Sequence, residues 1–169
     1  MKYRLVPLLL GIQIALHILG FDSPASVLSL SLMSSAILLE SQRDFESMAG
    51  SLASTGIKAQ APASLPGKSG VRHEFALAVI GDSGNPRIVV DTELSVREVE
   101  EMKVLKFYVK VFDVSPEKAI LCVSPHLSAK AMALAKEYGL VVLEDEVPRK
   151  LIPMAGAEVQ AILAKGSSK

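Results

Sequence analysis

The chain has 169 residues, which is room for one domain and an appendage. Its 18 Lys and Arg balance its 18 Asp and Glu, which excludes a strongly basic nucleic-acid-binding protein. Half of the residues are hydrophobic, and the mean hydropathy of +0.37 is above that of an average soluble protein. The single cysteine, Cys122, excludes a disulfide framework and a cysteine-based zinc site within one chain.

The hydrophobic excess lies in residues 1–39, which contain two apolar runs, Leu5–Phe21 and Val27–Leu39, separated by a turn at residues 22–24. The first run has 17 residues, the lower end of the ~17–25 residues that a transmembrane helix needs. This pattern predicts an apolar helical hairpin, with the protein attached to a membrane through residues 5–39.

Basic residues flank this hairpin at Lys2, Arg4 and Arg43. Because positively charged flanks stay on the cytoplasmic side of a membrane, they predict that the following domain lies in the cytoplasm. Two alternatives stay open: a cleaved secretory signal peptide, and a buried helical pair of a soluble protein.

After the hairpin the pattern changes to that of a folded domain. Charged and apolar residues alternate with a period near 3.6 from Glu40 to Gly56, which predicts a helix ended by the glycine. The Pro-, Ser- and Gly-rich residues 61–70 predict a loop. The apolar runs His73–Ile80 and Arg87–Asp91, joined by a polar segment, predict a β-hairpin.

A long helix is predicted next, from Ser95, because Ser95 and Glu98 have the spacing of a capping box. Apolar side chains then recur every three or four residues and predict its buried stripe. The opposite face carries lysines and Glu100. The stripe consists of Val96, Val99, Met102, Leu105, Val109 and Phe112.

A strand–helix–strand unit follows. Ala119–Ser124 and Leu140–Leu143 are short apolar runs, and Ser128–Tyr138 between them has a helical pattern. Two buried strands joined through a helix predict a parallel βαβ unit. The last part, residues 151–169, is predicted as a tail with a helical stretch at Glu158–Lys165.

This order of elements, with residues 56–58, Gly70–Phe75 and Arg87–Asp91 at its centre, resembles the restriction-endonuclease-like fold. Within that fold the chain looks most like Mrr-type and archaeal members, some of which carry membrane helices ahead of the nuclease domain. The resemblance covers roughly residues 40–145. It implies an α/β domain over residues 40–150, with a mixed sheet flanked by helices, behind the hairpin of residues 1–39.

The resemblance also implies a catalytic motif: an acidic residue on one hairpin strand and an (Asp/Glu)-x-Lys pair on the next. In such nucleases two carboxylates hold Mg²⁺ and the lysine helps to activate water. Carried onto this chain, the three positions fall at Ala76, Asp91 and Glu93. Only Asp91 matches, so the motif is degenerate.

Substitutes for the missing groups are available nearby. Glu74 lies two residues from Ala76, so it is predicted to share its strand face and to hold the metal together with Asp91. A lysine of the following helix can replace the missing one, and a glutamate of the first helix can add a carboxylate. The candidate catalytic residues are Glu74, Asp91, Lys103, Lys106, Lys110, Glu40 and Glu46, and the three lysines are also candidate nucleic-acid contacts.

These observations predict a membrane-associated nuclease-like protein that binds or cleaves DNA, with Mg²⁺ as cofactor if it is active. The alternative is a non-enzymatic, membrane-anchored protein-interaction module, whose partner is an unidentified protein; a homodimer is also considered. Convergence of the candidate carboxylates and one lysine within about 6 Å favours hydrolysis, and their scatter favours the module.

Overall fold

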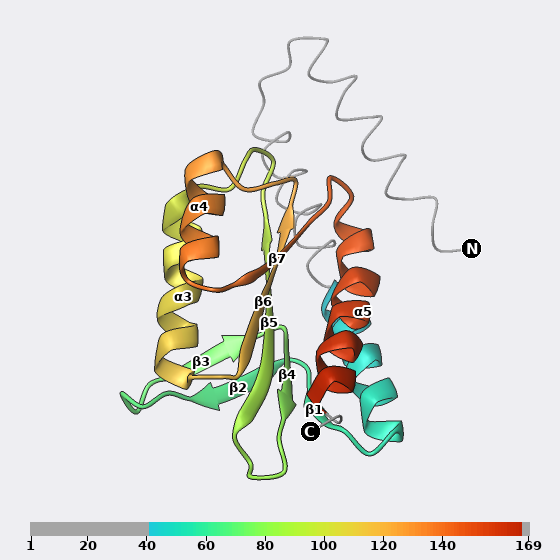
Figure 1. Cartoon of the computed structure of the whole chain (residues 1–169). Coiled ribbons are helices and arrows are strands. Elements are labelled where there is room, and N and C mark those ends of the chain that lie inside the picture. Colours follow the sequence, from blue (N-terminus) through green and yellow to red (C-terminus); the bar gives the residue numbers. More distant parts are fainter. Residues whose placement is uncertain (1–40, 167–169) are drawn as a thin grey trace, which may run out of the picture. The chain divides into compact units, whose positions relative to one another are not determined.

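The computed structural model describes residues 41–166. The apolar hairpin predicted over residues 1–39, and Glu40 with it, lie outside the described residues. Residues 41–166 form three layers, with a mixed β-sheet between two layers of helices (Figure 1). The predicted α/β class, with a mixed sheet flanked by helices, is confirmed.

The main sheet has five strands in the order β1-β4-β5-β6-β7. The β1–β4 and β4–β5 pairs are antiparallel, whereas β5–β6 and β6–β7 are parallel. The predicted hairpin and the predicted parallel βαβ unit are therefore both present. The bounds are β1 Lys58–Gln60, β4 Leu77–Ile80, β5 Pro86–Leu94, β6 Lys118–Ser124 and β7 Val141–Glu144.

The helices divide between the two faces of this sheet. Helices α3 (Glu101–Val114) and α4 (Ala129–Glu137) cover one face, and residues 41–54, also helical, cover the other together with α5 (Pro148–Gly166). Alternate residues of β5 enter the two cores: Val89 packs on the α3 side, and Val90 on the α5 side. This alternation follows from the period of two along a strand.

A second, two-stranded sheet corrects the predicted loop at residues 61–70. It is formed by β2 (Ala63–Pro66) and β3 (Arg72–Phe75), paired antiparallel. Ala63 and Leu65 are buried in the α3-side core, so their alternating burial stabilises a strand in a segment rich in proline and glycine.

The predicted single strand His73–Ile80 is wrong, because it is broken at Ala76 into β3 and β4, which belong to different sheets. Phe75 is buried on the α3 side and Leu77 on the α5 side. In a continuous strand, residues two apart share a face. The chain must therefore turn at Ala76.

Helix α3 also differs from its prediction, in its start and in its buried face. It begins at Glu101, and the Ser95 hydroxyl accepts a hydrogen bond from the Arg97 amide (3.2 Å) in a local turn instead of capping a helix. Of the predicted stripe, Val99 is buried at 2% exposure, whereas the members that lie within α3 face solvent: Met102 is 58% exposed and Phe112 71% exposed. The side chains buried against the sheet are Val104, Phe107 and Val114.

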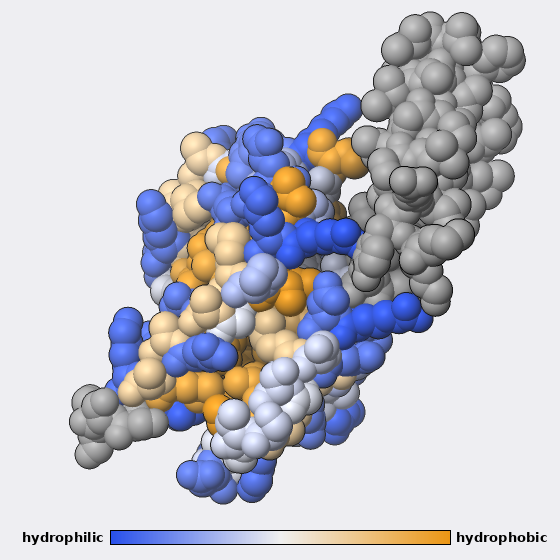
Figure 2. Space-filling view, turned by 90° about the vertical axis from the view of Figure 1, so that its right-hand side faces the viewer, coloured by the Kyte–Doolittle hydropathy of each residue, from blue (hydrophilic) through white to orange (hydrophobic). Residues whose placement is uncertain are grey.

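The tail predicted over residues 151–169 is also revised, because α5 starts at Pro148 and packs on the main sheet. Four of its side chains are buried there: Leu151, Ile152, Ala155 and Val159. The face that carries α5 and residues 41–54 mixes hydrophilic and hydrophobic residues (Figure 2). Within residues 41–166, no helix is both long and apolar enough to cross a membrane.

Candidate functional site

The charged groups that the sequence singles out gather between β5 and α3. Asp91 and Glu93 are two residues apart on β5, so they point to the same side of the sheet. That side is the one covered by α3, which presents its lysines to them. We call the group Asp91, Glu93, Lys103, Lys106 and Lys110 the β5–α3 site.

Lys110 is the most tightly held member of the site. Its Nζ donates to Asp91 Oδ2 at 2.8 Å and to the Glu74 carbonyl oxygen at 2.9 Å. It also lies 5.5 Å from the centroid of the Phe75 ring, within the range of a cation–π contact. Lys110 therefore joins β5 to β3 as well as neutralising Asp91.

Asp91 is only 22% exposed, and this burial raises the pKa of its carboxyl group above the ordinary value. The hydrogen bond and positive charge of Lys110, and the Thr92 amide that donates to Oδ1 at 3.1 Å, oppose the rise. The charge of Glu93 adds to it. Since a buried carboxylate is costly without a partner, the contact with Lys110 favours the ionised form of Asp91.

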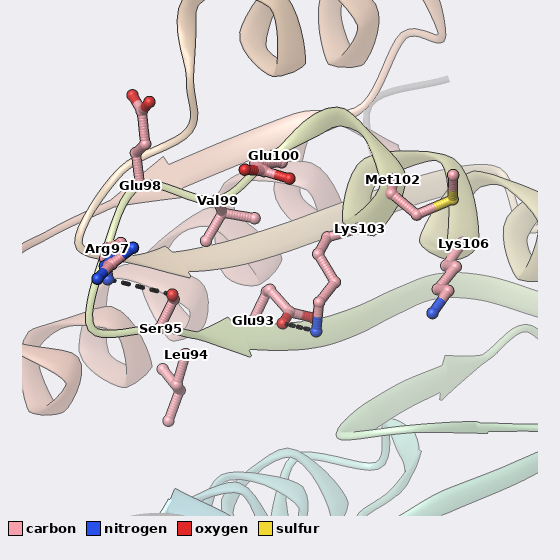
Figure 3. Close-up of a pocket in the computed structure, with 10 residues that line it drawn as sticks. All are labelled: Glu93, Leu94, Ser95, Arg97, Glu98, Val99, Glu100, Met102, Lys103 and Lys106. Atoms are coloured by element: carbon pink, nitrogen blue, oxygen red, sulfur yellow. Dashed lines mark hydrogen bonds and ion pairs between the residues drawn. The ribbon is translucent and has the colours of Figure 1, made fainter.

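A second ion pair lies about two turns earlier on α3, where Lys103 Nζ contacts Glu93 Oε1. Lys106 follows, is exposed, and forms no ion pair with any residue of the described part of the chain. Figure 3 shows Lys103 reaching from α3 to Glu93 on β5, and Lys106 projecting further along the helix without a partner.

Two adjoining cavities open beside these lysines. One, of about 160 Å³, is lined by both ion pairs and by Lys106. The other, of about 330 Å³, lies at the end of β5 and includes Arg97 and Glu98 in its wall (Figure 3). Lys103, Lys106 and Glu93 line both cavities. A small anion entering either cavity would meet Lys106.

Asp113, at the end of α3, anchors the β2–β3 loop beside this site. Its Oδ2 accepts from the Ser69 hydroxyl at 2.6 Å and contacts His73 Nε2 at 2.7 Å, while Oδ1 accepts from the Ser69 amide at 2.8 Å. Those hydrogen bonds lower the pKa of Asp113 to about 2. A Cβ atom at position 67 would lie 1.8 Å from Asp113 Oδ2, so only glycine at this position lets the loop pack against the Asp113 carboxylate.

The structure therefore brings together some of the predicted residues and separates others. Asp91 meets Lys110, whereas Glu46 is exposed on residues 41–54, which cover the opposite face of the sheet. Glu74 is exposed on β3 and approaches Lys110 through its carbonyl oxygen. Glu74 does not share a strand face with Ala76, because β3 ends at Phe75 and Ala76 lies outside both strands.

Two features of the site were missed from sequence. Glu93 was considered only as the place of an absent lysine, although its spacing from Asp91 already indicated a shared strand face. The contact of His73 with Asp113 joins residues that are 40 positions apart and lie on different elements, so no local sequence pattern predicts it.

Both carboxylates of the site are paired with lysines. No group of three or more His, Cys, Asp and Glu able to hold a metal ion occurs within residues 41–166. Asp91 and Glu93 each direct a carboxylate oxygen at a lysine ammonium, which occupies the direction that a cation would need. A metal ion bound to those same oxygens would compete with the two ammonium groups.

No protein-family model matches the chain, and no curated protein matches its sequence. Solved structures are similar in fold. Protein VC1899 from Vibrio cholerae has a TM-score of 0.50 and 12% identity over 72% of this chain and 33% of that one. This likeness is one of fold alone.

Two further structures are less similar. A protein of unknown function, AF1548, has a TM-score of 0.47 and 14% identity over 60% of this chain and 56% of that chain. A repair endonuclease from Pyrococcus abyssi has a TM-score of 0.37 and 22% identity over 53% and 38%. The chain spans less than two thirds of each of these three proteins.

Proposed function

We propose that residues 41–166 are a degenerate restriction-endonuclease-like domain whose β5–α3 site binds nucleic-acid phosphates without cleaving them. The order of a helix, an antiparallel hairpin, a helical crossover and a parallel strand supports this fold. So does Asp91, which lies on the second hairpin strand, where the resemblance implies a catalytic carboxylate.

One observation supports the binding role. Two lysines of α3 neutralise the carboxylates of Asp91 and Glu93, and Lys106 remains as an exposed positive charge. The five charged groups sum to +1, from three lysines and two acids. About half or more of the hydrogen bonds between proteins and DNA go to phosphate and sugar oxygens, and lysine ammonium groups are among their donors. Lys106 can make such a contact without breaking an ion pair.

Lys103 is the second phosphate-binding group of this proposal. Its side chain is 50% exposed, and that of Glu93 is 24% exposed. Exposed ion pairs contribute only about 0–1 kcal/mol, so Lys103 can exchange Glu93 for a phosphate at little cost. Lys110, held by Asp91, Glu74 and Phe75, stays in place.

The same proposal includes attachment to a membrane through residues 5–39, with the domain on the cytoplasmic side. Its support is the sequence: an apolar run of 17 residues, a second run after a turn, and basic flanks. A tethered binding domain would hold nucleic acid close to the bilayer.

The test is fluorescence anisotropy of labelled duplex and single-stranded DNA with the full chain in neutral detergent micelles. Lys106→Ala is expected to raise Kd about fivefold, the effect of losing about 1 kcal/mol of charged contact. The matched control is Lys136→Ala, which removes another exposed lysine, from α4. Equal losses in both variants, or no binding by the parent, would contradict the proposal.

Catalysis is tested separately by calorimetric titration with Mg²⁺ and Mn²⁺, and by cleavage assays in the same metals. We expect neither binding at the site nor cleavage, in the parent or in Asp91→Asn. Cleavage by the parent that disappears in Asp91→Asn would restore the hydrolytic assignment and overturn the non-cleaving one.

A second candidate function, a non-enzymatic interaction module, is favoured by a different observation. The solvent face of α3 carries four exposed apolar side chains in a row: Met102, Leu105, Val109 and Phe112. Exposed apolar stripes on a helix are typical of contact surfaces between proteins.

A further inference from the structure

The apolar row on α3 has the geometry of a contact between two helices. Met102, Leu105, Val109 and Phe112 are 58%, 37%, 54% and 71% exposed, and we call them the α3 seam. Their spacing is three, four and three residues, the repeat at which two helices pack along each other. Each of the four side chains keeps more than a third of its surface exposed to solvent.

The seam points directly away from the protein's own core. Leu105 and Val109 lie two residues on either side of the buried Phe107, and at about 100° per residue each projects roughly 160° from it. A partner can therefore approach without disturbing the packing of α3 on the sheet. On one flank, Tyr108 is already occupied by stacking on Tyr138 of α4, with ring centroids 3.8 Å apart.

Charged residues flank the seam in a self-complementary way. Glu101 and Lys106 lie on opposite flanks and five residues apart, the spacing at which charges of two parallel, in-register helices meet. Neither forms an ion pair within residues 41–166. A two-fold axis along the seam would create two Glu101–Lys106 pairs between identical chains.

We propose that the occupant of the α3 seam is α3 of a second copy of this chain, parallel and in register. An antiparallel pairing centred on Phe107 would place Lys106 beside Lys106 of the second copy, and like charges in contact are unfavourable. The charge pattern therefore selects the parallel arrangement. This inference does not depend on the nucleic-acid function.

The size of the seam sets the strength of the contact. Stable interfaces bury about 800 Å² on each partner, and four partly exposed side chains are fewer than such an area requires. The dimer is therefore reversible and forms at micromolar or higher concentrations.

Sedimentation of the full chain in neutral detergent tests the surface. Val109→Glu is expected to give a monomer at concentrations where the parent is dimeric. Val71→Glu is the control, because Val71 lies outside α3 and is 56% exposed against 54% for Val109. A parent that stays monomeric up to about 100 μM, or a dimer that survives Val109→Glu, overturns the proposal.

Charge exchange tests the flanking residues. Glu101→Lys alone and Lys106→Glu alone are each expected to raise the dimer dissociation constant roughly tenfold, because each converts two attractive pairs into repulsive ones. The double variant is expected to return to within about threefold of the parent. Failure of the double variant to recover overturns the assigned pairing.

Disulfide trapping tests the register. In a parallel dimer, Leu105→Cys and Val109→Cys each cross-link to themselves under mild oxidation, whereas Glu137→Cys, exposed on α4, does not. The native Cys122 is buried and does not interfere. Cross-linking that occurs only when the Leu105→Cys and Val109→Cys chains are mixed would show an antiparallel contact. A monomeric parent whose binding to lipid vesicles is lost in Val109→Glu would show that the seam contacts lipid. Either outcome overturns the proposal.

Discussion

Asp113 illustrates how a single side chain connects elements that are distant in sequence. It receives hydrogen bonds from Ser69 and contacts His73, so the end of α3, the β2–β3 loop and β3 are fastened together. β3 in turn supplies the carbonyl oxygen and the aromatic ring that hold Lys110. Asp113 thereby positions the β5–α3 site without belonging to it.

The lowered pKa of Asp113 predicts an acid-dependent contribution to stability. Its folded-state pKa is about 2 against an ordinary value of 3.8, so the contribution is complete above pH 3.8 and is lost as the pH falls towards 2. In urea unfolding between pH 5 and pH 2, the difference in stability between the parent and Asp113→Asn is expected to shrink over this window. A difference that stays constant with pH would contradict the prediction.

At the scale of elements, α3 shows where a periodic pattern becomes ambiguous. Its sequence contains two interleaved apolar stripes, one through Val104, Phe107 and Val114, the other through the α3 seam. Both satisfy a helical period, so periodicity alone cannot decide which one is buried. The structure places the first against the sheet.

This arrangement predicts effects of very different size on stability for the same substitution at two positions of α3. Val104→Ala is expected to lower the free energy of unfolding by about 2 kcal/mol, because Val104 is fully buried. Val109→Ala, in dilute protein, is expected to change it by less than about 0.5 kcal/mol. Chemical denaturation measures both, and equal losses would mean that the buried face of α3 is wrongly assigned.

The other helices and strands were predictable from sequence where their signals come from residues close together in the chain. The βαβ unit of β6, α4 and β7 follows from apolar runs and from the Ser128 hydroxyl, which caps α4 by accepting from the Ala131 amide. The break at Ala76 has no local signal, since it depends on Phe75 and Leu77 entering different cores. Within the candidate site, Asp91 was predictable from its position on a strand. Its pairing with Lys110 was not, because it depends on which face of α3 packs against the sheet.

At the scale of the whole molecule, the two proposals share one side chain. Lys106 lines the cavities of the β5–α3 site and also flanks the α3 seam. Its single positive charge would have to serve both a phosphate and Glu101 of a second copy, and these two negatively charged groups repel each other.

Nucleic acid is therefore expected to oppose dimerisation. Saturating DNA should raise the dimer dissociation constant of the parent, and by reciprocity dimerisation should weaken DNA binding by the same factor. Sedimentation with and without DNA measures the shift, and Lys106→Ala should abolish it. If DNA instead promotes dimerisation, the two roles do not compete for Lys106.

The position of β6 has a further consequence, for exchange of backbone hydrogens with solvent. β6 is bonded to β5 on one side and β7 on the other, and its residues from Ala119 to Ser124 are buried. β1, with three residues, forms one border of the sheet. Amide deuteration at the border can proceed by fraying, whereas deuteration of the β6 amides that bond to the central strand β5 requires opening of the sheet interior. The slowest amides of this chain therefore report its global free energy of unfolding.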